Sequence, residues 1–365
     1  MDYERLKYWL WLTYIEDMWR AKAEKVLDVF GTPEELYYSN ENILKKSGIF
    51  TEQDIYNVIL SKDNINIEEK WSQLDKKGIR FTTYESEDYP EKLLAYSDKP
   101  LWLYYKGNLP SKSERLVGVV GARNCSVYGK TMAETISQQI GNYAVSVVSG
   151  MARGIDGAAH RGALKAGART YAVLGCGVDM CYPRENIELY MRIQERGGIL
   201  SEYIPGAEPL QWRFPERNRI ISMLSDAVAV IEAKKNSGSL ITADYALQYG
   251  KELFAVPGRV GDLLSTGCNE LIKTGAGLLT EGADMLFATG LSVPDERECE
   301  KNNSKIVLEK EKNIVYSCLG LLPQNIETIV EKTGMTSAEV FGSLVRLMVV
   351  GLVVEPTKNH YARVK

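Results

Sequence analysis

The sequence lacks the features of a membrane or secreted protein. Its 365 residues contain no uncharged apolar run of about 18, the length that crosses a bilayer, so no membrane partner is expected. The first four residues, Met1-Asp2-Tyr3-Glu4, include two acids where a signal peptide would carry positive charge. We therefore expect a cytoplasmic protein.

Histidine is scarce, and cysteine follows no recognisable pattern. His160 and His360 are the only histidines, which leaves little for a zinc site or a His-based catalytic triad. The six cysteines are scattered, and the closest pair, Cys176 and Cys181, lies in a Gly-rich segment. Reduced thiols are expected, because disulfides are rare in the cytosol. No metal ion and no cofactor is predicted.

Neither sign of charge is in large excess over the whole chain. There are 44 Lys and Arg against 48 Asp and Glu, which gives a net charge of −4. The distribution is uneven, because residues 118–220 carry 12 basic and 9 acidic side chains. This region is where an anionic partner would be received.

Two nucleotide-binding fingerprints are missing. The sequence has no G-x-x-x-x-G-K-[ST] loop, and Gly175-Cys176-Gly177 does not continue as G-x-G-x-x-G. A hydrolase would need a base, and Asp156, Glu202 and Glu232 are available, but acids at strand–helix joints more often cap helices or pair with arginine. His160 is expected to pack or hydrogen-bond. We predict no catalytic residue and a protein that is not an enzyme.

Composition and periodicity divide the chain into five segments. We predict an N-terminal helical domain at 1–75, a connecting segment with short strands at 76–114, a Rossmann-like domain at 115–289, a polar linker at 290–304 and a winged-helix domain at 305–365. The first domain is similar to SAM or helix-hairpin-helix modules. Its acidic surface favours packing or protein contact over DNA binding.

The middle segment alternates short β-branched runs with longer helical stretches. Runs such as Leu116–Val120 and Ala227–Ile231 are continuously apolar, as in parallel strands that are buried on both faces. Helices are expected between the strands, for example at Tyr128–Gly141 and Asp156–Lys165. Right-handed crossovers then predict an α/β fold with an extended, Rossmann-like, doubly wound parallel sheet.

The last segment is predicted to contain three helices and a terminal hairpin. The helices are expected at 306–319, 326–332 and 337–348, in the order of a winged helix-turn-helix. The candidate recognition helix, 336–348, has only Arg346 as a base, which is poor for duplex binding. A protein-contact or dimer-support role is preferred for this domain.

Glycine and small hydroxyl residues follow several strands of the predicted sheet, at the edge where ligands bind in open parallel sheets. The loops with this composition are Gly121–Gly129, Ser149–Asp156, Gly175–Gly177 and Lys234–Ala243. Backbone N–H groups at the following helix N-termini favour an anion. Arg123 and Arg153 add positive charge at two of these joints. Together the four loops predict an anion-binding site.

The segment Trp212–Arg219 interleaves aromatic side chains with arginines. Arginine binds phosphate in a bidentate way, and an aromatic face stacks on any base. The alternative is that Trp212 and Phe214 are core residues beneath a loop, more so for Trp212 than for Phe214. The pattern favours nucleic acid as the anion.

These motifs together resemble the bacterial DNA-processing protein A family (DprA, also called Smf). The matching stretches run in order through the predicted Rossmann-like domain: Asp88-Tyr89-Pro90, Gly121-Ala122-Arg123, Ser126 to Gly129, Ser149 to Asp156, Ala159-His160, Tyr182-Pro183, Ser201-Glu202, Phe214 to Arg219, Ser237 to Ala243, Val256-Pro257-Gly258 and Gly275-Ala276. The flanking helical and winged-helix domains are also similar to those that the family often carries.

The resemblance implies a recombination mediator rather than an enzyme. Family members bind single-stranded DNA cooperatively, act as dimers, protect incoming strands and help to load the recombinase RecA during natural transformation. The implied partners are therefore single-stranded DNA, RecA and a second copy of the chain, for which the segment Leu263–Ile272 offers an apolar interface.

The resemblance also implies a set of DNA-binding residues. By position, the implied phosphate contacts are Arg123, Ser126, Arg217 and Arg219. Phe214 would lie against a base, and the implied pocket floor is Gly150, Gly238 and Ser239. Arg153 and Asn218 complete the predicted set.

Two departures and two alternatives qualify the resemblance. Cys125 stands where Pro is usual, and Cys268 where Thr or Ser is common, but neither change removes a charge. A nucleotide hydrolase of the lysine-decarboxylase-like phosphoribohydrolase type is the alternative; the loop Asn236–Ala243 lacks the Glu and the double glycine of those enzymes. A transcription regulator led by the winged helix is the third possibility.

Overall fold

The computed structural model describes residues 3–290, 310–320, 322–349 and 351–363. The contacts divide the chain into two compact units, Met1–Ser292 and Val293–Lys365. Of the predicted linker 290–304, only Gly290 lies within the described residues.

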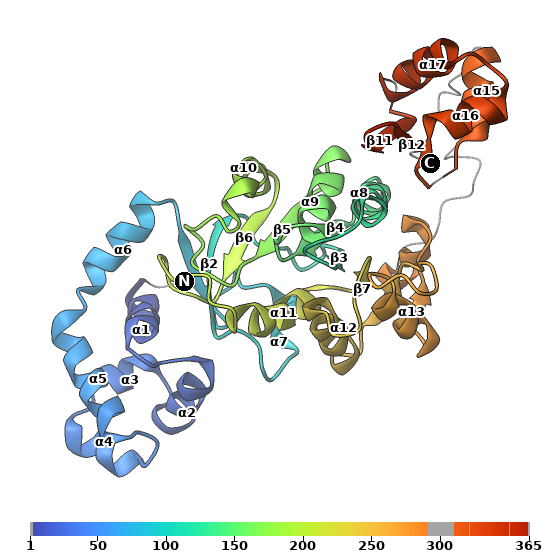
Figure 1. Cartoon of the computed structure of the whole chain (residues 1–365). Coiled ribbons are helices and arrows are strands. Elements are labelled where there is room, and N and C mark those ends of the chain that lie inside the picture. Colours follow the sequence, from blue (N-terminus) through green and yellow to red (C-terminus); the bar gives the residue numbers. More distant parts are fainter. Residues whose placement is uncertain (1–2, 291–309, 321, 350, 364–365) are drawn as a thin grey trace. The chain divides into compact units, whose positions relative to one another are not determined.

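A nine-stranded sheet, in the order β1-β2-β6-β5-β4-β3-β7-β8-β9, forms the centre of the first unit (Figure 1). The strands from β6 to β9 in this order pair in parallel. Their bounds are β3 Leu116–Val120, β4 Ser146–Ser149, β5 Thr170–Val173, β6 Gly198–Ser201, β7 Ala227–Val230, β8 Glu252–Ala255 and β9 Gly277–Leu278. The chain winds outward from β3 in one direction and then, from β7, in the other. The predicted doubly wound, Rossmann-like sheet is confirmed, and its topological switch point lies between β3 and β7.

The region that the sequence suggested as a connecting segment belongs to the same sheet. Strand β1 (Arg80–Thr83) pairs antiparallel with β2 (Trp102–Gly107), and β2 pairs antiparallel with β6. The side chains of Leu103, Tyr104 and Tyr105 are buried, so β2 has apolar contacts on both faces. These short strands therefore extend the parallel sheet instead of leading into it.

Helices cover both faces of the sheet. In Figure 1, α8 (Val127–Gly141), α9 (Ile155–Lys165) and α10 (Ile187–Arg196) lie on one side, and α11 (Arg213–Leu224) and α12 (Gly238–Gln248) lie on the other. The strand residues alternate between two hydrophobic clusters. On β3, Val117 and Val119 pack with α8 and α9, whereas Leu116 and Val120 pack with α11 and α12. The remaining elements of this region are α7 Glu91–Leu94, η1 Arg184–Asn186, α13 Thr266–Lys273, η2 Gly282–Met285 and η3 Phe287–Thr289.

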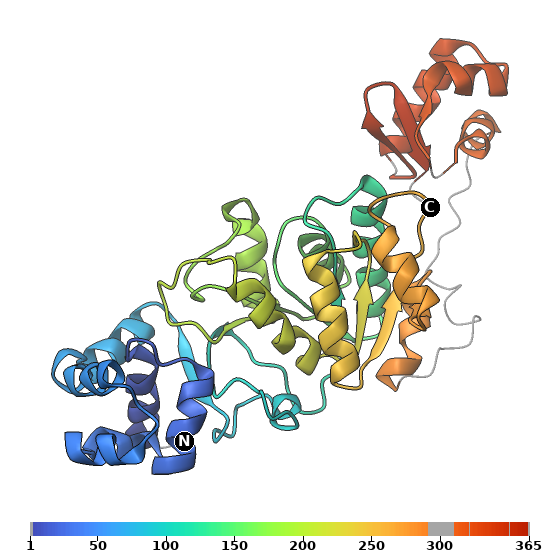
Figure 2. The same cartoon turned by 60° about the horizontal axis from the view of Figure 1, so that its bottom comes forward.

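Six helices precede the sheet: α1 Tyr3–Tyr14, α2 Arg20–Phe30, α3 Pro33–Tyr38, α4 Glu41–Ser47, α5 Glu52–Asn64 and α6 Ile67–Lys76. Figure 2 shows this group beside the β1–β2 edge. Thr32 caps α3 by accepting a hydrogen bond from Glu35 N. Trp9 and Leu12 share one hydrophobic cluster with Trp102 and Tyr104 of β2. The helical segment is thus packed against the sheet.

The second unit contains α15 (Lys310–Cys318), α16 (Ile326–Thr333) and α17 (Ser337–Val349), followed by the hairpin of β11 (Val353–Thr357) and β12 (His360–Arg363). The three helices and the hairpin were all expected from the sequence. A further strand, β10 (Gln324–Asn325), pairs with β12 and was not expected. The assignment of this second unit as a winged helix stays a prediction.

The following observations on membrane-spanning helices, cysteines and metal ligands hold for the described residues only. Within them, every helix is too short or too polar to cross a bilayer. Cys125, Cys176, Cys181, Cys268 and Cys318 are free thiols, and Cys299 lies outside the described residues. No group of three or more His, Cys, Asp or Glu side chains is placed there to hold a metal ion.

Candidate nucleic-acid interface

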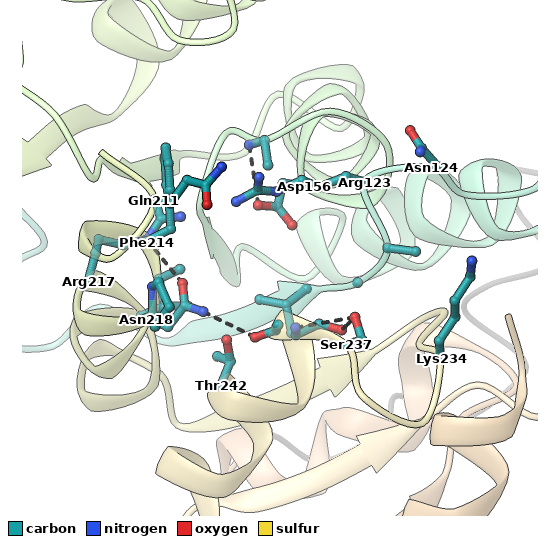
Figure 3. Close-up of a pocket in the computed structure, with 18 of the residues that line it drawn as sticks. Arg123, Asn124, Asp156, Gln211, Phe214, Arg217, Asn218, Lys234, Ser237 and Thr242 are labelled. Atoms are coloured by element: carbon teal, nitrogen blue, oxygen red, sulfur yellow. Dashed lines mark hydrogen bonds between the residues drawn. The ribbon is translucent and has the colours of Figure 1, made fainter. Parts of the chain in front are cut away.

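A pocket of about 740 Å³, here called the switch-point pocket, opens at the carboxyl ends of β3 and β7. Its walls come from the loop after β3, the start of α9, the α11 segment and the loop from β7 into α12 (Figure 3). Three of the four loops that the sequence singled out therefore meet at one place. Open parallel sheets bind ligands at this position, because neighbouring connections leave the sheet in opposite directions there.

Arg123 supplies an exposed positive charge to this pocket. It follows β3, and its guanidinium carbon lies 4.9 Å from the centre of the Phe214 ring. Neither an ion pair nor a hydrogen bond from this guanidinium is present among the described residues. The side chain is therefore held by a cation–π contact, which leaves its N–H donors available to a phosphate.

Phe214 lines the pocket from the first turn of α11 and is half-buried. Its ring centre lies 5.7 Å from that of Tyr182, with an interplanar angle of 30°. Tyr182 also lines the pocket and is 44% exposed. Phe214 is thus not buried in the core, and with Tyr182 it forms an aromatic wall. Trp212 is 59% exposed and lies outside the set of pocket-lining residues.

The beginning of α12 forms another wall. Ser237 caps the helix and accepts a hydrogen bond from Ser239 N, and both Gly238 and Ser239 line the pocket as expected. The amide of Asn218 donates to Gly238 O at 3.4 Å, which joins α11 to this helix start. The first turn of α12 and the exposed Lys234 line the same pocket. This wall suits an anion.

Arg217 lines the pocket, but its guanidinium donates hydrogen bonds mainly to the protein itself. It is 3% exposed, and Nη1 donates to Gly150 O and to Val173 O. Burial lowers its pKa to about 10, so it remains charged at neutral pH. Asp156 also lines the pocket, and burial raises the pKa of its carboxyl, opposed by the charge of Arg217. Arg217 therefore has fewer free donors than an exposed phosphate contact would have.

The expected phosphate contact by Arg219 is wrong. Its Nη2 lies 2.6 Å from both carboxylate oxygens of Glu202, Arg219 is 4% exposed, and it does not line the pocket. On α11, Arg217 and Arg219 are two residues apart and so point in different directions. Arg219 holds α11 against the end of β6 instead of reaching the pocket.

Two further predicted contacts lie behind the pocket wall. The Ser126 hydroxyl donates to Glu232 Oε1 at 2.5 Å and accepts from Gly129 N as the N-cap of α8. Gly150 lies beneath Arg217, whose guanidinium binds its carbonyl oxygen. Neither residue lines the pocket, so the expectation of a direct phosphate contact by Ser126 and of a floor at Gly150 is corrected.

Arg153 also lies outside the switch-point pocket. Its Nε donates to Glu185 Oε1 at 3.0 Å, and both side chains are more than half exposed. An exposed pair of this kind contributes little to stability and opens readily. The loop that carries Arg153 therefore provides a charge next to the pocket and not within it.

The acids and the histidine that could have acted as bases have structural partners. Glu202 accepts from Arg219, Glu232 from Ser126, and Asp156 from Ala152 N at 3.3 Å. His160 is fully buried, and its Nδ1 lies 2.6 Å from the Thr170 hydroxyl. These caps, arginine pairs and hydrogen bonds are the roles that the sequence predicted for them.

Six polar residues of the pocket were not among the predicted contacts: Asn124, Asp156, Gln211, Lys234, Asn236 and Thr242. All of them except Gln211 belong to loops that the sequence had identified, and their position after a strand of the sheet was the available signal. Gln211 precedes α11 and carried no such signal. Its contribution depends on how the segment before α11 folds back over the pocket (Figure 3).

Comparison with known proteins identifies relatives of this chain. The family model for DNA recombination-mediator protein A matches residues 80–289. DNA processing protein DprA of Streptococcus pneumoniae is 41% identical over 269 residues, which cover 67% of this chain and 95% of that protein. Protein Smf of Escherichia coli is 41% identical over 228 residues, 62% of this chain and 61% of that protein.

Two solved structures share the fold. The X-ray structure of the S. pneumoniae DprA superimposes with a TM-score of 0.66 and 37% identity, covering 77% of this chain and 97% of that one. DNA processing protein A of Helicobacter pylori, studied for its single-stranded DNA binding mode, gives a TM-score of 0.51 at 30% identity, covering 59% and 96%. Because the family model spans more than half of the sequence and agrees with these relatives, the chain belongs to the DNA recombination-mediator protein A family.

Proposed function

We propose that this protein is a single-stranded DNA-binding recombination mediator that holds the strand in the switch-point pocket. The observation that carries the proposal is the contact of Arg123 with the Phe214 ring at the rim of a pocket whose far wall is the start of α12. One place thus combines a free guanidinium, an aromatic wall and the N-terminus of a helix. The Helicobacter pylori relative, which binds single-stranded DNA, supports the choice of ligand.

The walls of the pocket suit different parts of a nucleotide. Arg123, Lys234 and the N-terminal end of α12, where the helix dipole is positive, suit phosphate oxygens. Phe214 and Tyr182 suit the face of a base, since stacking on an aromatic ring tolerates any sequence. The carboxylate of Asp156 disfavours a phosphate beside it, so the base rather than the phosphate would occupy that part of the pocket.

This arrangement predicts a preference for single strands. In a duplex the base faces are stacked on their neighbours and cannot reach Phe214. Fluorescence anisotropy with labelled single-stranded and duplex oligonucleotides of equal length, at several salt concentrations, tests the proposal. The single strand should bind more tightly, with log K falling by about 0.7 per phosphate neutralised for each log unit of salt. Equal affinity for the two forms would contradict it.

The mediator acts without catalysis in this proposal. The acids nearest the pocket are engaged by arginine, serine or backbone N–H groups, and among the described residues none of these carboxylates is arranged with a histidine as a general base. The discriminating assay incubates the protein with nucleoside monophosphates and with oligonucleotides and follows base release and strand cleavage. Turnover of a monophosphate would favour the phosphoribohydrolase alternative.

The partners of the bound strand form the second part of the proposal. The protein protects incoming single strands and loads RecA on them during natural transformation, in keeping with its membership of a recombination-mediator family. RecA filament formation on single strands, followed with and without the protein, tests this. Arg123→Ala protein should stimulate nucleation less than the parent, because it would hold the strand less well.

A homodimer is proposed through the late part of the sheet domain. Leu263, in the segment expected to form the interface, is 70% exposed, and Val260 beside it is fully exposed. In contrast, Leu271 and Ile272 pack partly against the core. Light scattering should give twice the chain mass of 40.9 kDa at micromolar concentration. Leu263→Glu should shift the protein to the monomer, since a charge would be buried at the interface.

A further inference from the structure

A second cavity of about 540 Å³ lies beside the switch-point pocket, between the starts of α8 and α9 and the helix η1. It is called the α8–α9 cavity here. Its lining residues are Arg123, Asn124, Cys125, Lys130, Arg153, Gly154, Gly157, Arg161, Glu185 and Asn186. Arg123 and Asn124 line both cavities, so the two adjoin at the loop after β3.

The charge of the α8–α9 cavity is strongly positive. Four of its lining side chains are cationic and one is acidic, and that acid, Glu185, is paired with Arg153. Lys130 and Arg161 line the cavity, and no carboxylate lies within ion-pair distance of either one in the part of the chain that the structure describes. Unpaired cations around a cavity attract an anion.

Two glycines lie in the wall of this cavity, Gly154 before α9 and Gly157 in its first turn. Gly154 has φ +73°, and a Cβ there would meet Ala122 O at 2.3 Å, so only glycine lets the loop before α9 pass against the loop after β3. A Cβ on Gly157 would lie 3.4 Å from Arg161 Nη1 and 3.5 Å from Asn186 Nδ2. The guanidinium of Arg161 therefore extends back along α9 over Gly157 toward η1, at the cavity.

The two cavities differ in what they can bind. The switch-point pocket has Phe214 and Tyr182 for stacking, whereas none of the residues that line the α8–α9 cavity is aromatic. Charge without a stacking surface suits the sugar–phosphate backbone better than a base. We propose that the α8–α9 cavity is a second subsite for the same strand, in which Lys130 and Arg161 hold internal phosphates of the nucleotides that continue from the switch-point pocket past Arg123.

This inference rests on the proposed function, because it extends the strand that the switch-point pocket holds. Lys130→Gln/Arg161→Gln tests it, since both residues lie on helix surfaces and their loss should leave the fold intact. A matched control, Lys165→Gln/Arg169→Gln, removes the same charge from residues that pair with Glu134 and Glu114 away from both cavities. Anisotropy is measured with oligothymidylates of about 4 and about 16 nucleotides, the range of site sizes for single-stranded DNA-binding modules.

The Lys130/Arg161 variant should bind the longer oligonucleotide about tenfold more weakly for each cation removed, with a salt slope smaller by about 1.4. It should bind the shorter one as the parent does, and the control should match the parent with both. Parental affinity for the longer strand would overturn the second subsite and leave the proposed function standing. An equal loss with both lengths would overturn it too, because the cations would then act only through long-range attraction.

Two further results complete the test. If the variant weakens only strands with a 5′-phosphate, the cavity takes a terminal phosphate, and the assignment to internal phosphates is overturned. If the parent protein itself binds neither oligonucleotide, the proposed function fails, and the second subsite fails with it. Equal losses with 5′-phosphate and 5′-hydroxyl strands support internal phosphates.

Discussion

The loop after β3 and the helix α11 bring arginines to the same edge of the sheet but use them differently. Arg123 is exposed, lies over the Phe214 ring and is part of both cavities. Arg217 and Arg219 of α11 are 3% and 4% exposed and bind backbone carbonyls and Glu202. The first arginine is available to a ligand, and the other two hold the wall against which the ligand would lie.

The comparison shows that an Arg-rich stretch is not by itself a binding surface. In Phe214-Pro215-Glu216-Arg217-Asn218-Arg219 the ring of Phe214 lines the pocket, whereas the guanidinium groups of Arg217 and Arg219 bind other parts of the protein. Substitution of these residues should therefore separate two kinds of effect. Loss of a buried arginine should lower stability, and loss of the exposed one should lower affinity.

The largest effect is expected for Arg219→Ala. Removing it leaves the Glu202 carboxylate buried without its partner, which costs about 3–5 kcal/mol in the free energy of unfolding. Chemical denaturation measures this loss. As a control, Arg219→Met/Glu202→Leu replaces both charges with apolar groups and should recover much of the stability. If the Arg219→Ala protein has normal stability but binds DNA more weakly, Arg219 contacts the strand and its structural role is contradicted.

A smaller and different effect is expected for Arg123→Ala. The variant should bind single-stranded DNA about 1.5–3 kcal/mol more weakly and show a smaller salt slope, because a charged phosphate contact is lost. Its midpoint of thermal unfolding should match that of the parent, since Arg123 is exposed. Anisotropy and thermal denaturation on the same samples check both points. A large loss of stability would place Arg123 with the structural arginines.

Phe214→Ala should weaken binding by about 1–3 kcal/mol without a change in the salt slope, because stacking is lost and no charge is removed. Phe214 also contacts Tyr182, so thermal unfolding is the necessary control. A variant that melts like the parent and binds the strand as tightly would remove the stacking role. Binding would then depend on the cations of the two cavities alone.

The smallest effect is expected for the pH dependence of stability, which the buried His160 should influence. Burial, with the charges of Arg161 and Arg217, lowers the pKa of His160 to about 3, whereas in the unfolded chain it is about 6.5. As pH falls below 6.5, His160 therefore binds a proton in the unfolded chain but stays neutral in the folded protein. The free energy of unfolding should decrease by up to about 1.4 kcal/mol per pH unit.

Denaturant unfolding of the parent and of His160→Gln between about pH 6.5 and 5 tests this point. The difference in slope between them is informative, because other groups such as Asp156 titrate in both proteins. Parallel curves would mean that His160 is not held neutral by the fold.

The hydrogen bonds of His160 also define the tautomer of its neutral ring. The Thr170 hydroxyl donates to Val147 O, so it accepts from Nδ1 of His160, which therefore carries the proton.

The element pattern was readable from the sequence because it is local. Continuous apolar runs identified the buried strands, and Gly or hydroxyl residues identified the joints where helices begin. The segment 76–114 was harder, because its short strands become part of the sheet only by pairing with β6, far along the chain. Strand pairing between distant segments leaves no periodic signal within either of them.

The sequence by itself therefore determined the fold class, the order of strands and α-helices from β3 to β9, and three of the loops that meet beyond β3 and β7. Only the tertiary structure decided which charged side chains are free. Ser126 donates a hydrogen bond to Glu232, which is 106 residues away in the sequence, and Arg219 pairs with Glu202 across the joint between β6 and α11. Lys130 and Arg161 come from different helices to one cavity. The physical reason is that periodicity and turn chemistry act between near neighbours, whereas burial and charge pairing depend on partners that only the folded chain brings together.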